Sequence, residues 1–124
     1  AKACNNMLLA TTMIGVGEAF NLGENLGLDL KKLFDVLSTS TGNCWAINTY
    51  CPIEGVGPTS PADNNFQPGF SVNLMLKDLT IALKAIKDTN TLAPFGTKSQ
   101  ENFKRMIDNK KGELDFSAIV NFNK

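Results

Sequence analysis

The sequence predicts an all-α domain, and three observations support this prediction. Apolar residues recur at spacings of three and four along several long segments, which is the pattern of helices that bury one face. No segment alternates apolar and polar residues as a half-buried strand does, and no internal repeat is visible. The 124 residues are 43% hydrophobic and 19% charged, which suits a single globular domain with a core of its own.

The first element is a long helix predicted over residues 1–26. Its glycines are less favourable in a helix than alanine by about 1 kcal/mol each, so we expect them where another helix packs closely. Gly27 is expected to end the helix. The face predicted to be buried comprises Met7, Leu8, Ala10, Thr11, Ile14, Gly15, Gly17, Ala19, Leu22 and Leu26.

The second helix is predicted over residues 29–40, where Asp29 is a suitable N-cap. The face of this helix predicted to be buried comprises Leu30, Leu33, Phe34 and Leu37. Residues 44–50, CWAINTY, predict only a short amphipathic turn or two. Residues 51–69 then carry four prolines and three glycines, but also apolar anchors at Ile53, Val56 and Phe66. We therefore expect an ordered loop in this segment rather than a linker, and long loops of this kind are often functional.

The remaining helices have recognisable boundaries. One is predicted over residues 71–90 with Ser71 as N-cap, and another over residues 94–110 with proline in its first turn. Asp115 is expected to open a last short helix over residues 116–122. The residues of the 71–90 helix that are predicted to face inward are Leu74, Leu79, Leu83 and Ile86.

Charge and hydropathy argue against several classes of partner. Twelve basic and twelve acidic residues cancel, so the chain lacks the electrostatic pattern of a protein that binds nucleic acid or an anionic membrane. The longest apolar runs are also too short to cross a bilayer. Two Gly-x-Gly segments, at residues 15–17 and 55–57, lack a third glycine and do not follow a predicted strand. We therefore interpret both as structural and expect no nucleotide-binding fold within these residues.

Cysteine and histidine usage narrows the possible chemistry. Cys4, Cys44 and Cys51 form no Cys-x-x-Cys pair, so the sequence suggests neither a zinc site nor a disulfide framework, and no metal site is expected. Free thiols are typical of a reducing compartment. The chain has no histidine, which excludes Ser-His-Asp and Cys-His catalysis by its own residues.

Two polar pairs are candidates for chemistry. Lys2 and Asn6 are four residues apart, so on a helix they share one face with about 6 Å between their Cβ atoms. Such a pair offers a proton carrier and an amide, although a lysine near a helix start is commonly just solvated. Lys77 and Asp78 are adjacent, so their side chains point about 100° apart and form no simple ion pair. Alternatively, Lys77 and Asp78 have no role in chemistry and form a solvated polar edge of their helix.

The order of short motifs along the chain adds a resemblance to a known family. The segments are KACNN, GVGEA, GLD, STGNCW, NTYCPIEGV, SPA, GF, LMLKDL and DFSAIVNF. Together they resemble the helical C-terminal domain of the 3-hydroxyisobutyrate dehydrogenases, a branch of the β-hydroxyacid dehydrogenases to which 6-phosphogluconate dehydrogenase is more distantly related. The resemblance covers essentially all 124 residues and is most specific from STGNCW through NTYCPIEGV.

The resemblance implies that two domains of the complete protein share its function. In that family a Rossmann domain precedes the long first helix, and the catalytic lysine lies near the start of that helix. Residues 1–124 are therefore expected to be a fragment, a single helical substrate-binding and dimerisation domain. NAD would be bound mainly by the absent N-terminal domain, and the fragment alone is expected to be inactive. Association into a homo-oligomer, a dimer or tetramer, is expected through helical surfaces.

The resemblance also implies roles for individual residues. Lys2 matches the catalytic lysine, which takes the proton from the substrate hydroxyl as hydride leaves for NAD. Asn6 matches the asparagine that holds the substrate. Lys77 matches a residue that contacts the cofactor, and Asp78 matches a neighbour that orients this corner and is counted with the cofactor-binding residues.

Three aromatic residues are implied at the substrate pocket. Trp45 and Tyr50 match aromatics that wall it, and Phe70 is a further candidate for the same wall. Without the resemblance, Trp45 and Tyr50 would be interpreted as aromatics of the core or its rim. A dry wall of this kind would strengthen polar contacts to a bound substrate.

The reaction implied is oxidation of 3-hydroxyisobutyrate to methylmalonate semialdehyde with NAD, a step of valine degradation. Alternatives are a related β-hydroxyacid dehydrogenase acting on serine, 3-hydroxypropionate or tartronate semialdehyde, or a non-catalytic helical interaction module. The compartment implied is the cytoplasm of a bacterium or the mitochondrial matrix. The choice between NAD and NADP depends on a residue of the preceding domain.

Overall fold

A computed structural model describes all 124 residues and has six α-helices, two short 3-10 helices and no β-strand, which confirms the predicted all-α class. Only one isolated antiparallel bridge, between Ser71 and Asp115, joins extended backbone segments. In chain order the elements are α1 (Lys2–Asn25), α2 (Leu30–Thr39), α3 (Trp45–Asn48), η1 (Pro61–Asn64), α4 (Val72–Thr89), α5 (Pro94–Asp108), η2 (Phe116–Ala118) and α6 (Ile119–Phe122).

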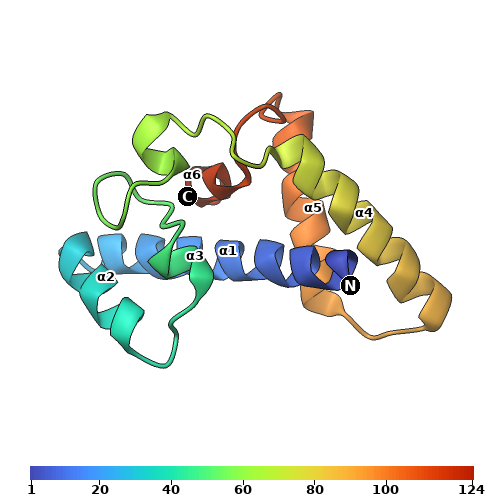
Figure 1. Ribbon diagram of the computed structural model, residues 1–124, viewed down its shortest axis with the longest axis horizontal. Coiled ribbons are helices and arrows are strands. Elements are labelled where there is room, and N and C mark those ends of the chain that lie inside the picture. The colour runs from blue at the N-terminus through green and yellow to red at the C-terminus, as the bar shows by residue number, and fades with distance from the viewer.

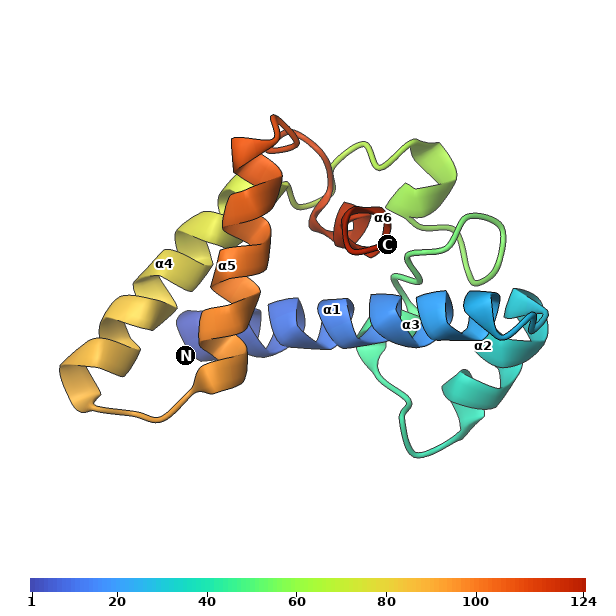
Figure 2. The same cartoon turned by 180° about the vertical axis from the view of Figure 1, so that it is seen from behind.

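Helix α1 is the axis on which the other helices pack. It runs through the middle of the molecule, with α4 and α5 side by side across its N-terminal half and α2 folded back at its C-terminal end (Figure 1). The reverse view shows α5 crossing α1 directly and α6 lying over the middle of α1 (Figure 2). The start of α1, where Lys2 and Asn6 lie, is therefore placed against α4, which carries Lys77 and Asp78.

The buried face of α1 differs from the predicted one. Ala10 and Gly17 are buried as expected, but Leu8, Leu22 and Leu26 are 61–67% exposed, and Gly15 and Ala19 are not buried either. The buried residues are Asn6, Ala10, Met13, Val16, Gly17, Phe20 and Gly23. Hydrophobicity alone pointed to the leucines, whereas the other helices of this chain cover the opposite side of α1.

The glycines of α1 confirm the expectation of close packing at two of three positions. A Cβ on Gly17 would lie 3.2 Å from Val120 of α6, and a Cβ on Gly23 would meet the side chain of Leu33 of α2. A Cβ on Gly15, in contrast, would have no neighbouring atom within 4 Å, so the prediction is wrong there.

The N-cap of α2 is the one predicted. The side chain of Asp29 accepts hydrogen bonds from the backbone N–H groups of Lys31 at 2.9 Å and Lys32 at 3.2 Å, which otherwise have no partner within the helix. The helix ends one residue before the predicted end, and its apolar residues are half-buried rather than buried.

Asp29→Ala is expected to lower the free energy of unfolding by about 1 kcal/mol, because two N–H groups lose their acceptor. Urea denaturation monitored by circular dichroism would measure this loss. Asp35→Ala is the matched control, since Asp35 lies on the same helix and only its backbone carbonyl, not its carboxylate, accepts hydrogen bonds there. It should change stability by less than about 0.5 kcal/mol. Equal losses in the two variants would contradict the capping role.

Helix α4 also buries a different set of residues from the predicted one. Leu79 is buried as expected and Leu83 and Ile86 are half-buried, but Leu74 is 48% exposed. The buried residues are Val72, Met75, Asp78, Leu79 and Ala82. The buried stripe therefore starts at Val72, and it includes a carboxylate that a hydrophobic pattern does not predict.

The segment between α3 and α4 is an ordered loop, as predicted. Its anchors Ile53, Val56 and Phe66 are half-buried against the core. The loop is closed by backbone hydrogen bonds to a distant part of the chain: the N–H groups of Asp115 and Phe116 donate to the carbonyls of Phe66 and Phe70, both at 2.8 Å. The predicted last helices are present as α5 and as η2 followed by α6.

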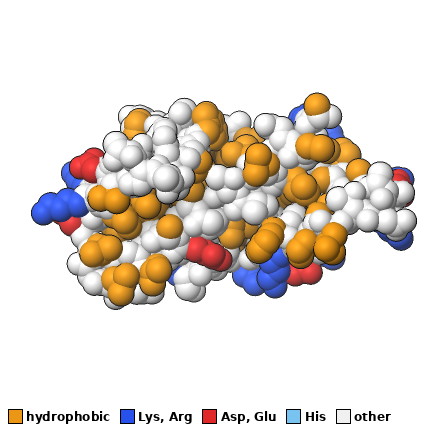
Figure 3. All heavy atoms as spheres, turned by 90° about the horizontal axis from the view of Figure 1, so that it is seen from below, with side chains coloured by type: hydrophobic (Ala, Val, Ile, Leu, Met, Phe, Trp, Pro, Cys, Tyr) orange, Lys and Arg blue, Asp and Glu red, His pale blue; other side chains and the backbone are white.

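The surface carries a broad set of exposed apolar side chains. Several apolar patches are visible on the face seen from below, on which α1 and α2 lie (Figure 3). The largest exposed apolar side chains of α1, α2 and their connection are Leu8, Leu22, Leu26, Leu28 and Val36. None of the helices is both long and apolar enough to span a bilayer.

Candidate functional site

The four polar residues predicted for the site lie together where α1 meets α4. The amide nitrogen of Asn6 donates a hydrogen bond of 2.5 Å to Asp78 Oδ2, and Lys2 Nζ lies 3.8 Å from Asp78 Oδ1. The Asp78 side chain is only 9% exposed, whereas that of Lys2 is 77% exposed. A buried carboxylate thus fixes the amide of Asn6 and attracts the ammonium group of Lys2 at the surface.

A small hollow of about 170 Å³ lies beside this cluster. It is lined by Lys2, Ala3, Lys77, Asp78 and Ile81. The two lysines come from different helices but reach the same hollow, where Asp78 is the single carboxylate. Asp78 pairs with Lys2 and not with Lys77, in agreement with the argument that adjacent helical residues diverge. The excess of positive charge suits an anionic or strongly polar ligand.

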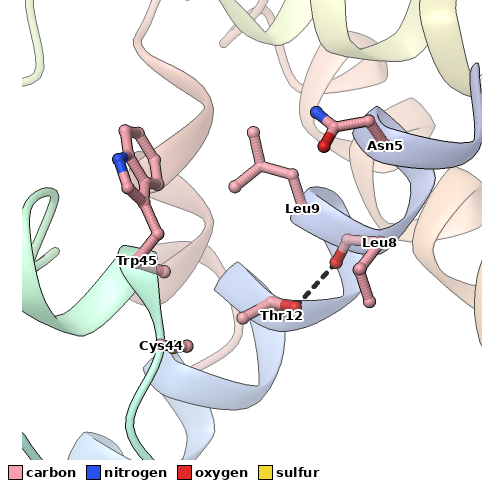
Figure 4. A pocket seen from close by; sticks show the side chains of 7 residues that line it. Asn5, Leu8, Leu9, Thr12, Cys44 and Trp45 are labelled. Atoms are coloured by element: carbon pink, nitrogen blue, oxygen red, sulfur yellow. Dashed lines mark hydrogen bonds between the residues drawn. The ribbon is translucent and has the colours of Figure 1, made fainter. Parts of the chain in front are cut away.

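A second, larger hollow of about 500 Å³ lies between α1 and α3 (Figure 4). Its lining is mostly apolar and comprises Asn5, Leu8, Leu9, Thr12, Cys44, Trp45 and Ala46. The Thr12 hydroxyl donates to the Leu8 carbonyl at 2.7 Å, so its proton is already used within the helix. Asn5 and the half-exposed indole of Trp45 are the side chains of this lining that carry N–H donors.

Asn5 lines the larger hollow and is joined by hydrogen bonds to the Lys2 cluster, and it was not among the predicted site residues. Its amide nitrogen donates to Asn6 Oδ1 at 3.0 Å, which extends the polar chain from Lys2 through Asp78 and Asn6 to the larger hollow. The sequence did contain a signal for Asn5, namely the two adjacent asparagines at residues 5 and 6. Adjacent helical residues face different directions, so when Asn6 faces one site, Asn5 faces a neighbouring one.

The three predicted aromatic residues belong to one cluster, but only Trp45 lines the larger hollow. Tyr50 stacks on Trp45 with 5.0 Å between ring centroids and an interplanar angle of 23°. Phe116 lies between Tyr50 and Phe70. Its ring centroid is 5.5 Å from that of Tyr50 and 6.0 Å from that of Phe70. Trp45 therefore faces the hollow, Tyr50 lies behind Trp45, and Phe70 is separated from Tyr50 by Phe116.

Two groups beside this cluster have pKa values that burial raises. Burial raises the pKa of Tyr50 well above its ordinary value, and the hydrogen bond to Asp115 raises it further, so the hydroxyl remains a donor throughout the neutral range. Burial also raises the pKa of the Cys51 thiol. All three cysteines are free, and Cys51 is the buried one. A neutral buried thiol is a poor nucleophile, so Cys51 is a core residue.

A further hollow of about 630 Å³ between α1, α5 and α6 contains none of the predicted site residues. No group of three or more histidine, cysteine, aspartate or glutamate side chains lies close enough to hold a metal ion. Among these hollows, the predicted site residues therefore line only the one at the Lys2 cluster and the apolar one between α1 and α3.

A long first helix that carries Lys2 and Asn6 packs against a helix that carries Lys77 and Asp78, and these are the positions at which the motifs resemble the β-hydroxyacid dehydrogenase class. The family model described as "NAD-binding of NADP-dependent 3-hydroxyisobutyrate dehydrogenase" matches residues 1–123. The chain belongs to this family, which confirms the resemblance stated from the motifs and NAD as the cofactor of the family.

Curated relatives and solved structures agree with this assignment. A "Probable 3-hydroxyisobutyrate dehydrogenase" of Mycobacterium tuberculosis is 48% identical over 120 residues, which are 97% of this chain and 40% of that protein. The mitochondrial 3-hydroxyisobutyrate dehydrogenase of Homo sapiens is 43% identical over 122 residues, 98% of this chain and 36% of that protein. This chain thus spans about 40% of the length of the M. tuberculosis relative.

The fold is shared with solved members. A structure of M. tuberculosis 3-hydroxyisobutyrate dehydrogenase with L-serine has a TM-score of 0.95 and 47% identity, covering all of this chain and 42% of that one. A 3-hydroxyisobutyrate dehydrogenase structure from Salmonella typhimurium has a TM-score of 0.82 at 21% identity, covering 98% of this chain and 40% of that one, and supports the fold alone.

Proposed function

We propose that this chain is the helical domain of an NAD-dependent dehydrogenase that oxidises 3-hydroxyisobutyrate to methylmalonate semialdehyde in valine degradation. The observation that carries the proposal is the convergence of Lys2, Lys77 and Asp78 on one polar hollow, where Asp78 also holds the amide of Asn6, together with an apolar hollow along the same helix α1. A hydroxyacid with an apolar branch needs both kinds of surface. The curated relatives at 43–48% identity bear the same enzyme name.

Lys2 is the proposed general base. Its ammonium group is open to solvent in this domain. We expect a nucleotide-binding domain and the substrate to cover the hollow in the complete enzyme, which disfavours the charged form of the lysine. The neutral amine then takes the proton of the substrate hydroxyl. A bound NAD would supply the hydride acceptor for the carbon that carries this hydroxyl.

Asn6 is proposed to hold the substrate against Lys2. Its Nδ2 donates one hydrogen to Asp78, and its Oδ1 accepts from Asn5. An amide nitrogen carries two hydrogens, so the second remains for a substrate oxygen. Because both ends of the amide are fixed, Asn6 is oriented before the substrate binds.

The residues of this chain fit only part of a dinucleotide. Lys77 lies at the rim of the polar hollow and can meet polar groups of the cofactor. Asp78 is too buried to be a major contact, so we propose that it contributes by orienting Asn6 and Lys2. No glycine-rich phosphate turn follows a strand in these residues, and we propose that a preceding Rossmann domain supplies it.

Self-association is proposed through the exposed apolar side of α1. Leu8, Leu22 and Leu26 are more than half exposed on one helix, and Gly15 leaves open space on that helix. Large exposed apolar patches are typical of protein–protein contacts. We propose a homo-oligomer in the cytoplasm of a bacterium or in the mitochondrial matrix, compartments that correspond to the bacterial and mitochondrial relatives.

The test is a substrate comparison with the full-length protein. NADH formation should be fastest with 3-hydroxyisobutyrate, with kcat/KM about tenfold or more above that for L-serine and 3-hydroxypropionate, because the apolar branch fills the larger hollow. Parallel assays with NADP would determine the cofactor preference. Preference for another hydroxyacid would keep the mechanism and change the substrate. No oxidation of any hydroxyacid would favour the helical interaction module instead.

A further inference from the structure

A buried carboxylate outside the proposed catalytic cluster has an unusually complete set of partners. Asp115 is fully buried and accepts five hydrogen bonds. Its Oδ1 accepts from the Tyr50 hydroxyl at 2.7 Å and from the backbone N–H groups of Gly69 and Phe70, both at 3.0 Å. Its Oδ2 accepts from the backbone N–H and the hydroxyl of Ser117, at 3.0 and 2.5 Å. Such a set compensates the cost of burying a charge.

The two oxygens of Asp115 face different parts of the molecule. Oδ2 is engaged only within its own turn, where it caps η2. Oδ1 reaches across the fold to the end of the 51–69 loop and to Tyr50, 65 residues away in sequence. The capping of η2 therefore accounts for the hydrogen bonds of Oδ2. It does not account for the hydrogen bond between Oδ1 and the Tyr50 hydroxyl.

The surroundings of the Tyr50 hydroxyl are shaped for this bond. A Cβ on Gly69 would lie 2.7 Å from the hydroxyl oxygen, so a side chain at this position would push Tyr50 away from Asp115. The Tyr50 ring also stacks on Trp45, and Trp45 is the aromatic wall of the larger hollow. A continuous line of contacts thus runs from Asp115 through Tyr50 to the hollow.

We propose that Asp115 and Tyr50 are positioning residues, and that together they set the orientation of the Trp45 indole against the substrate. This inference rests on the proposed function for its assignment of the hollow to the hydroxyacid. It also changes the expected role of Tyr50. The ring does not contact the substrate but fixes the residue that does, and the hydroxyl is anchored by Asp115.

The geometry provides a matched pair of variants. Tyr50→Phe and Ser117→Ala each remove one hydroxyl donor from the same carboxylate, and neither removes a backbone donor. Only Tyr50→Phe loosens a ring that contacts Trp45. A purely structural role for Asp115 predicts that the two variants behave alike.

Steady-state kinetics of the full-length enzyme with 3-hydroxyisobutyrate are the first readout. In Tyr50→Phe the KM for the hydroxyacid should rise about five- to tenfold, which is less than the full loss of one hydrogen bond to a charged group because Tyr50 acts on the substrate only through Trp45, with little change in kcat. In Ser117→Ala the KM should stay within about twofold of the wild-type value. Equal KM values in the two variants would overturn the proposal.

Fluorescence of Trp45 is the second readout, and it does not depend on turnover. Each variant is compared with the same variant carrying Trp45→Phe, so that the difference spectrum belongs to Trp45. Acrylamide quenching of this signal should increase in Tyr50→Phe and not in Ser117→Ala. Unchanged quenching in Tyr50→Phe would overturn the positioning role, as would increased quenching with an unchanged KM.

The two readouts also separate this inference from the proposed function. A wild-type enzyme that oxidises no hydroxyacid would refute the proposed function and, with it, the part of the inference that concerns substrate. The quenching comparison would still decide whether Asp115 and Tyr50 orient the indole.

Discussion

Replacing Lys2 with alanine in the full-length protein is expected to lower kcat for hydroxyacid oxidation by about 10²–10⁴-fold, the range typical for the loss of a general base. Lys2 is the lysine of the polar hollow that lies beside Asn6, the amide proposed to hold the substrate. No histidine exists in this chain to replace it. Single-turnover measurements of NADH formation would isolate the chemical step from product release.

Lys77→Ala is the matched control for this experiment. Lys77 lines the same hollow and its truncation removes the same charge, but it is assigned to the cofactor. We expect this variant to raise the KM for NAD with a much smaller loss in kcat. Because the Lys2 side chain is 77% exposed, Lys2→Ala should keep its circular dichroism spectrum. A folded Lys2→Ala enzyme that retains most of its kcat would show that the proton leaves by another route.

Replacing Phe20 with alanine is expected to lower the free energy of unfolding of the 124-residue chain by about 3–5 kcal/mol. Phe20 is fully buried in α1 and belongs to the central core cluster, so truncation removes apolar contacts and leaves a cavity. Domains of this kind are stable by only about 5–15 kcal/mol, so the loss is a large fraction of the total. Urea denaturation would measure it as a lower midpoint.

Leu22→Ala is the control on the same helix. Leu22 is 61% exposed, so its truncation should change the free energy of unfolding by less than about 0.5 kcal/mol when the chain is monomeric. Repeating the denaturation at several protein concentrations would separate folding from self-association. A Leu22→Ala loss as large as that of Phe20→Ala in a monomeric sample would contradict the buried face described for α1.

The helices could be predicted from the sequence because their signals are local. Spacings of three and four, the cap at Asp29 and the proline at the start of α5 all act within a few residues. The orientation of α1 could not be predicted in this way. Asn6 occupies a core position because Asp78 of another helix satisfies its amide, and Leu22 stays outside because no other element of the chain covers it.

The candidate site, too, could be predicted only in part from local sequence signals. Spacing alone placed Lys2 and Asn6 on one face, but the roles of Trp45 and Lys77 came from resemblance to a family and remain proposals. Asp115 was predicted as the start of a short helix, which its bond to Ser117 confirms. Its bond to Tyr50 spans 65 residues, and no local pattern contains that information.

The closure of the 51–69 loop has a consequence for how the domain acquires its shape during synthesis. The carbonyls of Phe66 and Phe70 are met by N–H groups of residues 115 and 116, and the N–H groups of Val72 and Asn73 donate to the carbonyls of Leu114 and Gly112. A ribosome delivers residues 45–73 well before residues 112–117. Helix α1 can form as soon as it emerges, but the aromatic cluster stays without its anchor until residues 112–117 leave the exit tunnel. The interval between these two events is when Trp45 and its neighbours are exposed to chaperones and to other nascent chains.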